Sequence, residues 1–245
     1  MGRAQSALTT STRSIGEGDD IIIGKGYYLG ITNGGNFDTE DGNDRIRGIS
    51  DIGLIYAYGI FNSSFTFNTG DGNDTIDGIG YYGIINHGLI NTGNGQDIII
   101  GKGINDGNAR GLSNFSTIDT GDNDDIIIGT GGIYNEGVIN TGNGNDSIIA
   151  AKEGFKSGSN SSGRVFLGNG EDYIEGFGSG DFYGGNGNDR LVLTPGSYSV
   201  GREGATVTLS KGNSLMLASE FEQLIAGSTI YDFTSLTAGQ IIVVA

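Results

Sequence analysis

Acidic side chains recur in this chain in a fixed setting that suits the binding of a hard cation. Eight times the sequence reads Gly-x-Gly-x-Asp-x-Ile/Leu or a close variant, and the copy built on Gly142, Gly144, Asp146 and Ile148 is typical. The glycines allow the backbone to turn sharply and to expose its carbonyl oxygens. Because a carboxylate follows the turn, each copy gathers the hard oxygen ligands that Ca²⁺ prefers in proteins. We expect the aliphatic residue that closes each copy to point the opposite way, into a core.

The copies recur with the spacing of stacked structural units. Their closing carboxylates are separated by 24, 30, 23, 28, 21, 26 and 17 residues. Self-similarity at such periods is typical of solenoids, in which each repeat packs on its neighbours. The aliphatic residues that we expect to face inward after each turn are Ile22, Ile46, Ile76, Ile99, Ile127, Ile148, Ile174 and Leu191.

Two further pieces recur between the turns. The first, Gly-Ile/Leu-x-Asn, ends on Asn33, Asn62, Asn86, Asn114 and Asn135. The second leads into the next turn and ends on Thr39, Thr69, Thr92, Thr120 and Thr141. Each coil is therefore predicted to hold about three short strands and three corners, paired in parallel with the next coil at ~4.8 Å. The variable lengths at 49–58 and 105–110 should form loops on one side.

Composition supports this prediction and excludes several classes of protein. The 245 residues include 48 Gly but one Pro, and no stretch has helical periodicity, so we predict an all-β chain. A net charge of −16 argues against a nucleic-acid partner, which needs a basic surface. Eight divalent ions would balance that charge. No apolar run approaches the ~20 residues of a membrane span. Without cysteine, disulfides have no role.

The repeat divides the chain into three parts. Residues 1–13 are polar and predicted to be disordered, residues 14–192 carry the solenoid, and residues 193–245 are predicted to form a β-rich C-terminal cap over its open end. The narrower spacing near Asp172 and Asp189, which are 17 residues apart, predicts coils of two strands there. The predicted fold is thus a parallel β-solenoid, similar to a β-roll or β-helix, with calcium-binding turns and a β-rich cap.

The eight copies resemble the calcium-binding nonapeptide of the repeats-in-toxin (RTX, hemolysin-type) family, Gly-Gly-x-Gly-x-Asp-x-aliphatic-x. The resemblance implies that several Ca²⁺ ions bind between adjacent coils. As carboxylate ligands it implies Asp20, Asp44, Asp74, Asp97, Asp125, Asp146, Asp172 and Asp189. Turn geometry and carbonyl oxygens would come from Gly16, Gly18, Gly42, Gly70, Gly72, Gly93, Gly95, Gly121, Asn123, Gly142, Gly144, Gly168, Gly170, Gly185 and Gly187.

The chain departs from the family pattern in three ways. Glu40 stands at the first glycine position of the second copy, and Asn123 replaces the second glycine of the fifth, although Asn tolerates the left-handed region. The leading Gly-Gly pair is intact only at Gly184 and Gly185. Family coils carry two such loops and ions on both sides. Most coils here carry one, which predicts a single column of ions.

Several alternatives remain open for these residues. The loops could be tight turns without metal. The Asn series could bind a ligand, but a ladder that bonds backbone groups between coils fits better. One Thr per coil gives a single file, which is too narrow for an ice-binding face. His87 has no nucleophile at fixed spacing, so a Ser/His/Asp site has little support, and no catalytic domain is visible.

The neighbours of the inward residues should point outward. In coils four to six they are aliphatic and would form an apolar stripe, which includes Ile98, Ile100, Ile126, Ile128 and Ile149. The stripe could be covered by a loop or by the tail. Alternatively, it could contact another copy or a larger parent protein.

We therefore predict a secreted, extracellular or cell-surface calcium-binding module, structural or adhesive, and not an enzyme, or the export and folding module of a larger protein. Its C-terminal residues 240–245 are similar to a type I secretion signal but lack the usual acidic residue. The alternative is a polysaccharide-binding or polysaccharide-processing β-helix enzyme. Tyrosines that follow the first strand of coils one to three could stack on a cell-surface glycan, namely Tyr27, Tyr28, Tyr56, Tyr58, Tyr81 and Tyr82.

Overall fold

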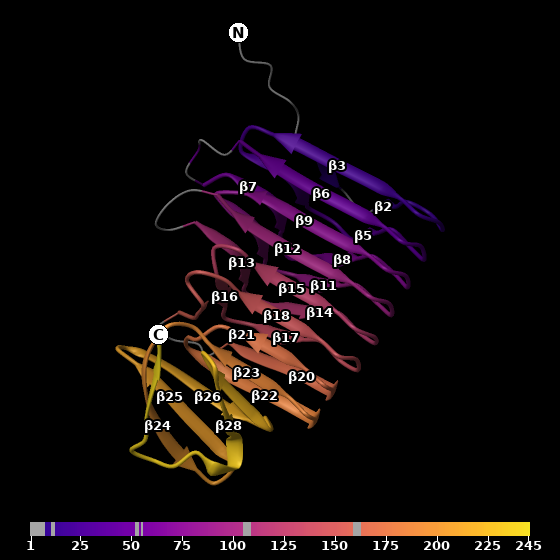
Figure 1. Cartoon of the computed structure of the whole chain (residues 1–245). Coiled ribbons are helices and arrows are strands. Elements are labelled where there is room, and N and C mark those ends of the chain that lie inside the picture. The colour runs from indigo at the N-terminus through magenta and orange to yellow at the C-terminus, as the bar shows by residue number, and fades with distance from the viewer. Residues whose placement is uncertain (1–7, 11–12, 52–53, 55, 105–108, 159–162) are drawn as a thin grey trace.

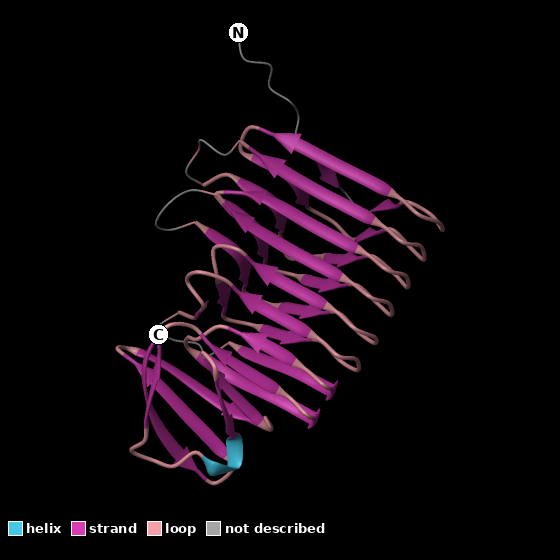
Figure 2. Cartoon of the chain, in the orientation of Figure 1, coloured by secondary structure: helices cyan, strands magenta, loops and turns pink. Residues whose placement is uncertain are grey.

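The chain folds as an all-β parallel solenoid, as the sequence predicts (Figures 1 and 2). The structure is a computed structural model that describes residues 8–10, 13–51, 54, 56–104, 109–158 and 163–245. Its coils stack along one axis, and each full coil contributes one strand to each of three sheets, which we call sheets A, B and C.

Sheets A and C form two faces of the solenoid. Sheet A holds β1 (Leu8–Thr10), β4 (Leu29–Asn33), β7 (Tyr58–Asn62), β10 (Tyr82–Asn86), β13 (Arg110–Asn114), β16 (Ile133–Asn135) and β19 (Phe155–Lys156). Sheet C holds β3 (Ile21–Gly26), β6 (Arg45–Ser50), β9 (Thr75–Gly80), β12 (Ile98–Gly103), β15 (Ile126–Gly129), β18 (Ser147–Ala150), β21 (Tyr173–Glu175), β23 (Arg190–Leu193), β27 (Gln223–Ala226) and β28 (Thr229–Asp232).

Sheet B forms the third face and continues into the C-terminal region. Its solenoid strands are β2 (Arg13–Ser14), β5 (Phe37–Asp38), β8 (Thr66–Asn68), β11 (Leu89–Asn91), β14 (Thr117–Asp119), β17 (Val138–Asn140), β20 (Arg164–Gly170) and β22 (Gly180–Gly187). Beyond them lie β26 (Ser214–Ser219), β25 (Thr206–Lys211), β24 (Gly196–Glu203) and β29 (Ile241–Val244). A single turn of 3₁₀ helix, η1, covers Phe233–Ser235.

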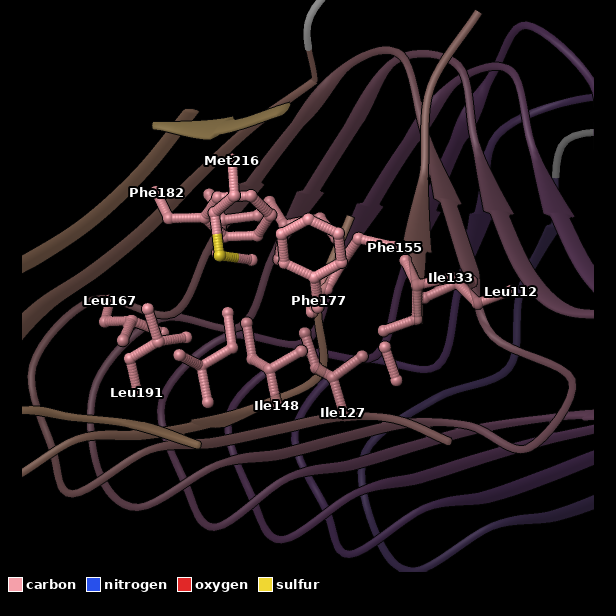
Figure 3. Close-up of a cluster of buried hydrophobic side chains, with 14 of the residues drawn as sticks. Leu112, Ile127, Ile133, Ile148, Phe155, Leu167, Phe177, Phe182, Leu191 and Met216 are labelled. Atoms are coloured by element: carbon pink, nitrogen blue, oxygen red, sulfur yellow. The ribbon is translucent and has the colours of Figure 1, made fainter. Parts of the chain in front are cut away.

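The core is a set of aliphatic and aromatic columns that run along the axis. The predicted inward residues pair in register, so that Ile99 lies between Ile76 and Ile127 on neighbouring strands of sheet C. From Ile46 onward, every predicted inward residue of sheet C is fully buried. Figure 3 shows the columns meeting in the interior near the C-terminal end. Burial of each side chain of this kind is worth about 1.5–3 kcal/mol.

The ends of the solenoid differ from one another. Residues 8–10 and 13–14, within the segment predicted to be disordered, form β1 and β2, and the rest of residues 1–12 lie outside the described part. At the other end, sheet A stops at β19, so the next coils hold only strands of sheets B and C. The 17-residue spacing predicted this narrowing. Antiparallel pairs β24–β25, β25–β26, β24–β29 and β27–β28 then close the end.

Two buried ladders of polar side chains tie the coils together at their corners. Each Asn of the predicted series donates its amide to the next, as from Asn62 to Asn86 at 2.8 Å. Each Thr donates to a carbonyl of the following coil, as from Thr92 to Thr120 at 3.2 Å. The prediction that the Asn series forms a ladder between coils is therefore confirmed. The Thr side chains are buried, so they form no surface that could bind ice.

The apolar stripe lies on the outer face of sheet C, as predicted. Ile98 pairs with Ile126, and Ile100 with Ile128, all with partly or fully exposed side chains. Ile126 is 37% exposed. Beside the stripe, Asp77 is held between Arg47 and Lys102 at 3.3 and 3.0 Å. No helix in the described part of the chain is long and apolar enough to cross a membrane.

Candidate metal centre

The Gly-x-Gly-x-Asp loops form one corner of the solenoid, between sheets B and C. Their glycines take positive φ values that L-residues avoid, for example +85° at Gly93 and +143° at Gly95. The two departures from the motif adopt the same conformation, with φ of 61° at Glu40 and 84° at Asn123. Glu40 is supported there by a bond from its N–H to Asp38 Oδ1 at 3.0 Å.

Beyond the first loop, the stacking leaves no room for a side chain at the glycines of the motif. A Cβ added at Gly95 would lie 1.7 Å from the carbonyl oxygen of Gly72 in the preceding coil. At Gly72 the same atom would lie 1.8 Å from the oxygen of Gly42. The glycines are therefore required twice over, by the turn and by the close approach of successive backbones.

The carboxylates of the motif face inward, which corrects the expectation that each would point opposite to its aliphatic partner. Asp97 and Asp172 are fully buried, and Asp44, Asp74, Asp125, Asp146 and Asp189 are at most 2% exposed. The reason is the period of the strand. Asp97 and Ile99 are two residues apart and so lie on the same face. Only Asp20, in the first loop, is partly exposed.

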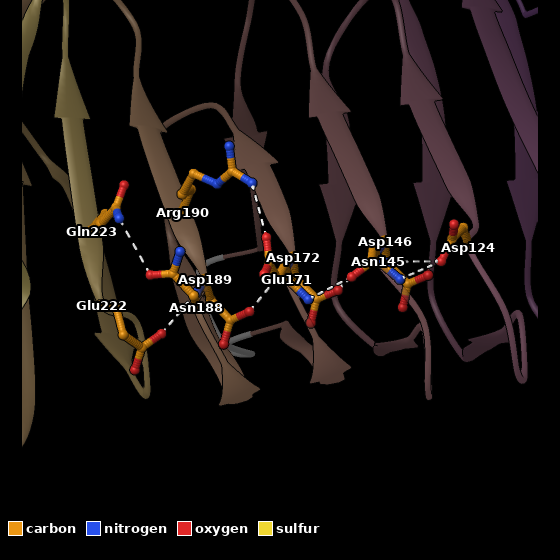
Figure 4. Close-up of polar contacts among 10 residues, drawn as sticks. All are labelled: Asp124, Asn145, Asp146, Glu171, Asp172, Asn188, Asp189, Arg190, Glu222 and Gln223. Carbon is orange, nitrogen blue, oxygen red and sulfur yellow. Dashed lines mark hydrogen bonds and ion pairs between the residues drawn. The ribbon is translucent and has the colours of Figure 1, made fainter.

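One oxygen of each buried carboxylate bonds to the preceding coil. The Oδ1 atom of Asp125 accepts the backbone N–H of Asp97 at 2.8 Å, and Asp146 does the same for Asp125. The pattern is unbroken from the N–H of Asp20 to the carboxylate of Asp189. We call this file of seven carboxylates the Asp column; its C-terminal part is drawn in Figure 4.

The other oxygen of each carboxylate has no hydrogen-bond partner. The Oδ2 atoms of Asp44, Asp74, Asp97, Asp125, Asp146, Asp172 and Asp189 are all buried and unsatisfied. The hydroxyl of Thr69 lowers the pKa of Asp74, so it lies near that carboxyl group, although it also donates to the carbonyl of Thr92 at 3.3 Å. Thr92, Thr120 and Thr141 stand in the same relation to Asp97, Asp125 and Asp146. A buried unpaired charge is costly, so each Oδ2 needs a cation or a proton.

Burial raises the pKa of six of these carboxyl groups, those of Asp74, Asp97, Asp125, Asp146, Asp172 and Asp189. Desolvation is the main cause throughout, and it raises the pKa of Asp125 to about 8 and of Asp74 to about 7. The pKa of Asp172 rises to about 7, and those of Asp97 and Asp146 to about 6. Repulsion from neighbouring carboxylates adds to the effect at Asp125 and Asp172. The hydroxyl of Thr120 and the backbone N–H of Asp97 oppose it at Asp125, and the backbone N–H of Asp146 opposes it at Asp172.

Exposed acidic and amide side chains surround the Asp column on the outside of the loops. The N–H of Asn145 donates to Asp124 Oδ1 at 2.7 Å, and that of Glu171 to Asn145 Oδ1 at 2.9 Å. A second outer file runs between the glycines, where Asn94 donates to Asp71 at 3.0 Å. These files explain why the position before each Asp is so often Asp or Asn. They also keep the corner negative.

The donor set of this corner fits calcium in its chemistry. Carboxylates of neighbouring coils present hard oxygens with orphaned lone pairs, which is the ligand type that Ca²⁺ takes. The carboxylates lie in a single row along the solenoid, one from each coil. Among the described residues, no group of three or more His, Cys, Asp or Glu side chains is placed to hold a metal ion. An ion here would therefore be shared between coils and completed by carbonyl oxygens.

Glu222 is a member of this corner that sequence reasoning missed. Its Oε2 accepts the N–H of Asp189 at 2.7 Å, the place that the next motif Asp would fill. Glu222 follows no glycine pair, so the motif does not reveal it. The only sequence signal is Leu224, which continues the aliphatic column beside Leu191.

Without calcium, we expect stability to fall as the pH rises from 5 to 8. The carboxyl pKa values are raised in the folded state, so protonation stabilises it below pH ~4, and this stability is lost through pH 6–8. One pKa unit corresponds to about 1.4 kcal/mol, and each kcal/mol shifts the melting temperature by about 2–4 °C. We therefore expect the melting temperature in chelator to drop by about 10 °C or more as the pH rises from 5, until most of the β-sheet is lost near neutral pH.

Thermal melts followed by circular dichroism at several pH values measure this effect. Saturating calcium should abolish or reverse the trend, because metal binding requires the deprotonated carboxylates. A melting temperature that stays constant from pH 5 to 8 in chelator would contradict the raised pKa values.

The fold and this corner together define a class, a three-sided parallel β-solenoid with a file of buried carboxylates along one edge. Comparison with protein-family models, with curated proteins and with solved structures gives no match.

Proposed function

We propose that this chain is a secreted calcium-binding scaffold, in which ions held between stacked coils drive folding. The observation that carries the proposal is the row of seven buried Oδ2 atoms without partners. No basic side chain reaches them in the described part of the chain, where the four ion pairs all lie elsewhere. Calcium would satisfy these oxygens and cancel the repulsion between coils, as the resemblance to RTX repeats also implies.

The role that suits such a scaffold is structural or adhesive rather than enzymatic. Calcium is scarce inside cells and abundant outside, so a chain of this kind would stay unfolded until export and fold afterwards. Strand β29 (Ile241–Val244) pairs with β24 in the folded protein, so a type I secretion signal there would be read before folding. The outer stripe of sheet C is the surface that we propose for contact with another copy or with a larger parent protein.

Replacement of single column carboxylates by the isosteric amide tests the proposal. In Asp146→Asn, the remaining oxygen can still accept the N–H of Asp125, but the charge that would bind calcium is gone. An ion at 100 times its Kd contributes ~2.7 kcal/mol. We therefore expect the melting temperature in saturating calcium to fall by about 5–10 °C and the calcium midpoint of folding to rise.

Asp20→Asn is the matched control, because Asp20 lies at the end of the file and is partly exposed. It should change the midpoint much less. If Asp146→Asn instead raises the melting temperature equally with and without calcium, the carboxylates of the column repel one another but bind no metal, and the proposal is wrong.

A further inference from the structure

Two neighbouring cavities form a groove on the side of the solenoid away from the Asp column. One has a volume of about 260 Å³ and is lined by Tyr81, Arg110 and Tyr134, among others. The second, of about 210 Å³, includes Lys152 and Lys211. They share Glu153, Gly154 and Lys156 in their walls, so they adjoin. Together they reach the size of a small-ligand site.

The groove follows from the narrowing of the solenoid. It runs along the corner between sheets C and A, where the turns after β9, β12, β15 and β18 lie above one another. Sheet A ends at β19, and the turn between β25 and β26 of the cap carries Lys211 and Ser214 to the edge of this step. The groove is therefore a feature of the backbone, not of side-chain rotamers alone.

Flat aromatic rings line the N-terminal part of the groove. Tyr81 and Tyr82 meet edge to face with centroids 4.9 Å apart, and Tyr82 stacks on Tyr58 at 5.6 Å. The guanidinium of Arg110 lies 3.7 Å above the ring of Tyr134. Tyr56, at the mouth, is 65% exposed. Such rings offer apolar faces and polar hydroxyls to a ligand that is itself amphipathic.

Positive charge gathers in the same groove, against the character of the rest of the chain. The protein carries −16 overall and has only 13 Lys and Arg. Four of these line the two cavities, namely Arg110, Lys152, Lys156 and Lys211, with a single carboxylate, Glu153. Glu153 pairs with Lys156 at 2.8 Å, and that pair is half exposed, so it can open to a ligand at little cost.

From this combination we propose that the groove binds an acidic oligosaccharide, a chain of sugar rings that carries carboxylates. The sugar rings would lie against Tyr81 and Tyr82, and their carboxylates would bond to Arg110, which Tyr134 holds in place, and to the lysines. Neutral sugars would contact the tyrosine rings but would form no ion pair with Arg110 or the lysines. The repulsive corner of the Asp column, on the other side, would hold an acidic polymer away and so direct it to this groove. The exposed acidic side chains outside the Asp column keep this repulsion when calcium is bound, so the site depends on calcium only through the fold.

Calorimetric titration with a hyaluronan hexasaccharide, which carries a uronate at every second sugar, tests the proposal. The protein is kept in calcium at a concentration where its β-sheet circular dichroism is complete. We expect binding that weakens as salt is raised. Lys152→Gln combined with Lys156→Gln removes two exposed charges and should weaken binding by about tenfold or more. Tyr81→Leu, which keeps bulk but removes the flat ring, should also weaken it.

The matched control is Lys25→Gln combined with Arg164→Gln, which removes two exposed charges outside the groove and should leave affinity unchanged. A chitin hexasaccharide, neutral and of equal length, should bind at least tenfold more weakly. The proposal is overturned if hyaluronan does not bind, if both double variants lose affinity equally, or if chitin binds as well. Because folding is read separately by circular dichroism, failure here leaves the calcium proposal standing.

Discussion

In excess chelator at neutral pH, the protein is expected to lose most of its β-sheet circular dichroism and to regain it when calcium is added. Seven buried carboxylates then lack a counter-ion, and the glycine-rich loops lose much conformational entropy on ordering. Extracellular calcium modules bind at ~10⁻⁴–10⁻³ M. Several coupled ions at ~2.7 kcal/mol each would supply on the order of 10 kcal/mol, comparable with the whole stability of a domain.

A calcium titration followed by circular dichroism measures this transition, with magnesium at the same concentration as the control for ionic strength. The transition should be cooperative, because each ion between two coils orders both of them. Magnesium should not replace calcium, since it dehydrates reluctantly. An unchanged spectrum and melting temperature in excess chelator would mean that the loops of this corner are tight glycine turns that bind no metal.

Gly95→Ala should be among the most destabilising single substitutions in the chain. The new Cβ would lie 1.7 Å from the Gly72 carbonyl oxygen, and backbone must move to admit it. It would also require φ of +143°, which L-residues rarely adopt. We expect a loss of about 4 kcal/mol or more, seen as a fall of about 8–16 °C in melting temperature in saturating calcium.

Gly204→Ala separates the two causes of this loss. Gly204 also has a positive φ, +59°, but an added Cβ there meets nothing within 4 Å. Its substitution should cost about 1–2 kcal/mol, the strain of the left-handed conformation alone. Equal losses at the two positions would show that the coils separate freely, against the tight stacking seen here.

The architecture could be predicted from the sequence because each repeat contains the local signals for its own turns and strands. Glycine pairs mark the turns, and residues such as Ile76 and Ile99 mark the inward face at every coil. The Asn ladder was likewise predictable, since Asn62 and Asn86 recur at one corner without a catalytic partner. The shortened interval before Asp189 predicted that the coils at this end of the solenoid lose one strand.

Other features depend on contacts that no local pattern encodes. The inward turn of Asp97 follows from its two-residue offset to Ile99, but the bond of Asp125 to the N–H of Asp97 depends on how two coils stack. Glu222 reaches the column from the cap through the parallel pairing of β27 with β23. The groove brings Arg110 and Lys211, far apart in sequence, to one side of the solenoid, because the turn between β25 and β26 lies at the step where sheet A ends.

The Asp column has a direction, and this gives the folding reaction an order. The backbone N–H of each motif Asp is satisfied by the coil that follows it, and that of Asp189 by Glu222. A coil therefore cannot complete its own corner until its C-terminal neighbour is in place. We expect the cap to serve as the nucleus and the coils to add towards the N-terminus, opposite to the order of synthesis. In a chain that is still being translated, the hydrogen bonds along this edge would then stay unmade until residue 222 is synthesised.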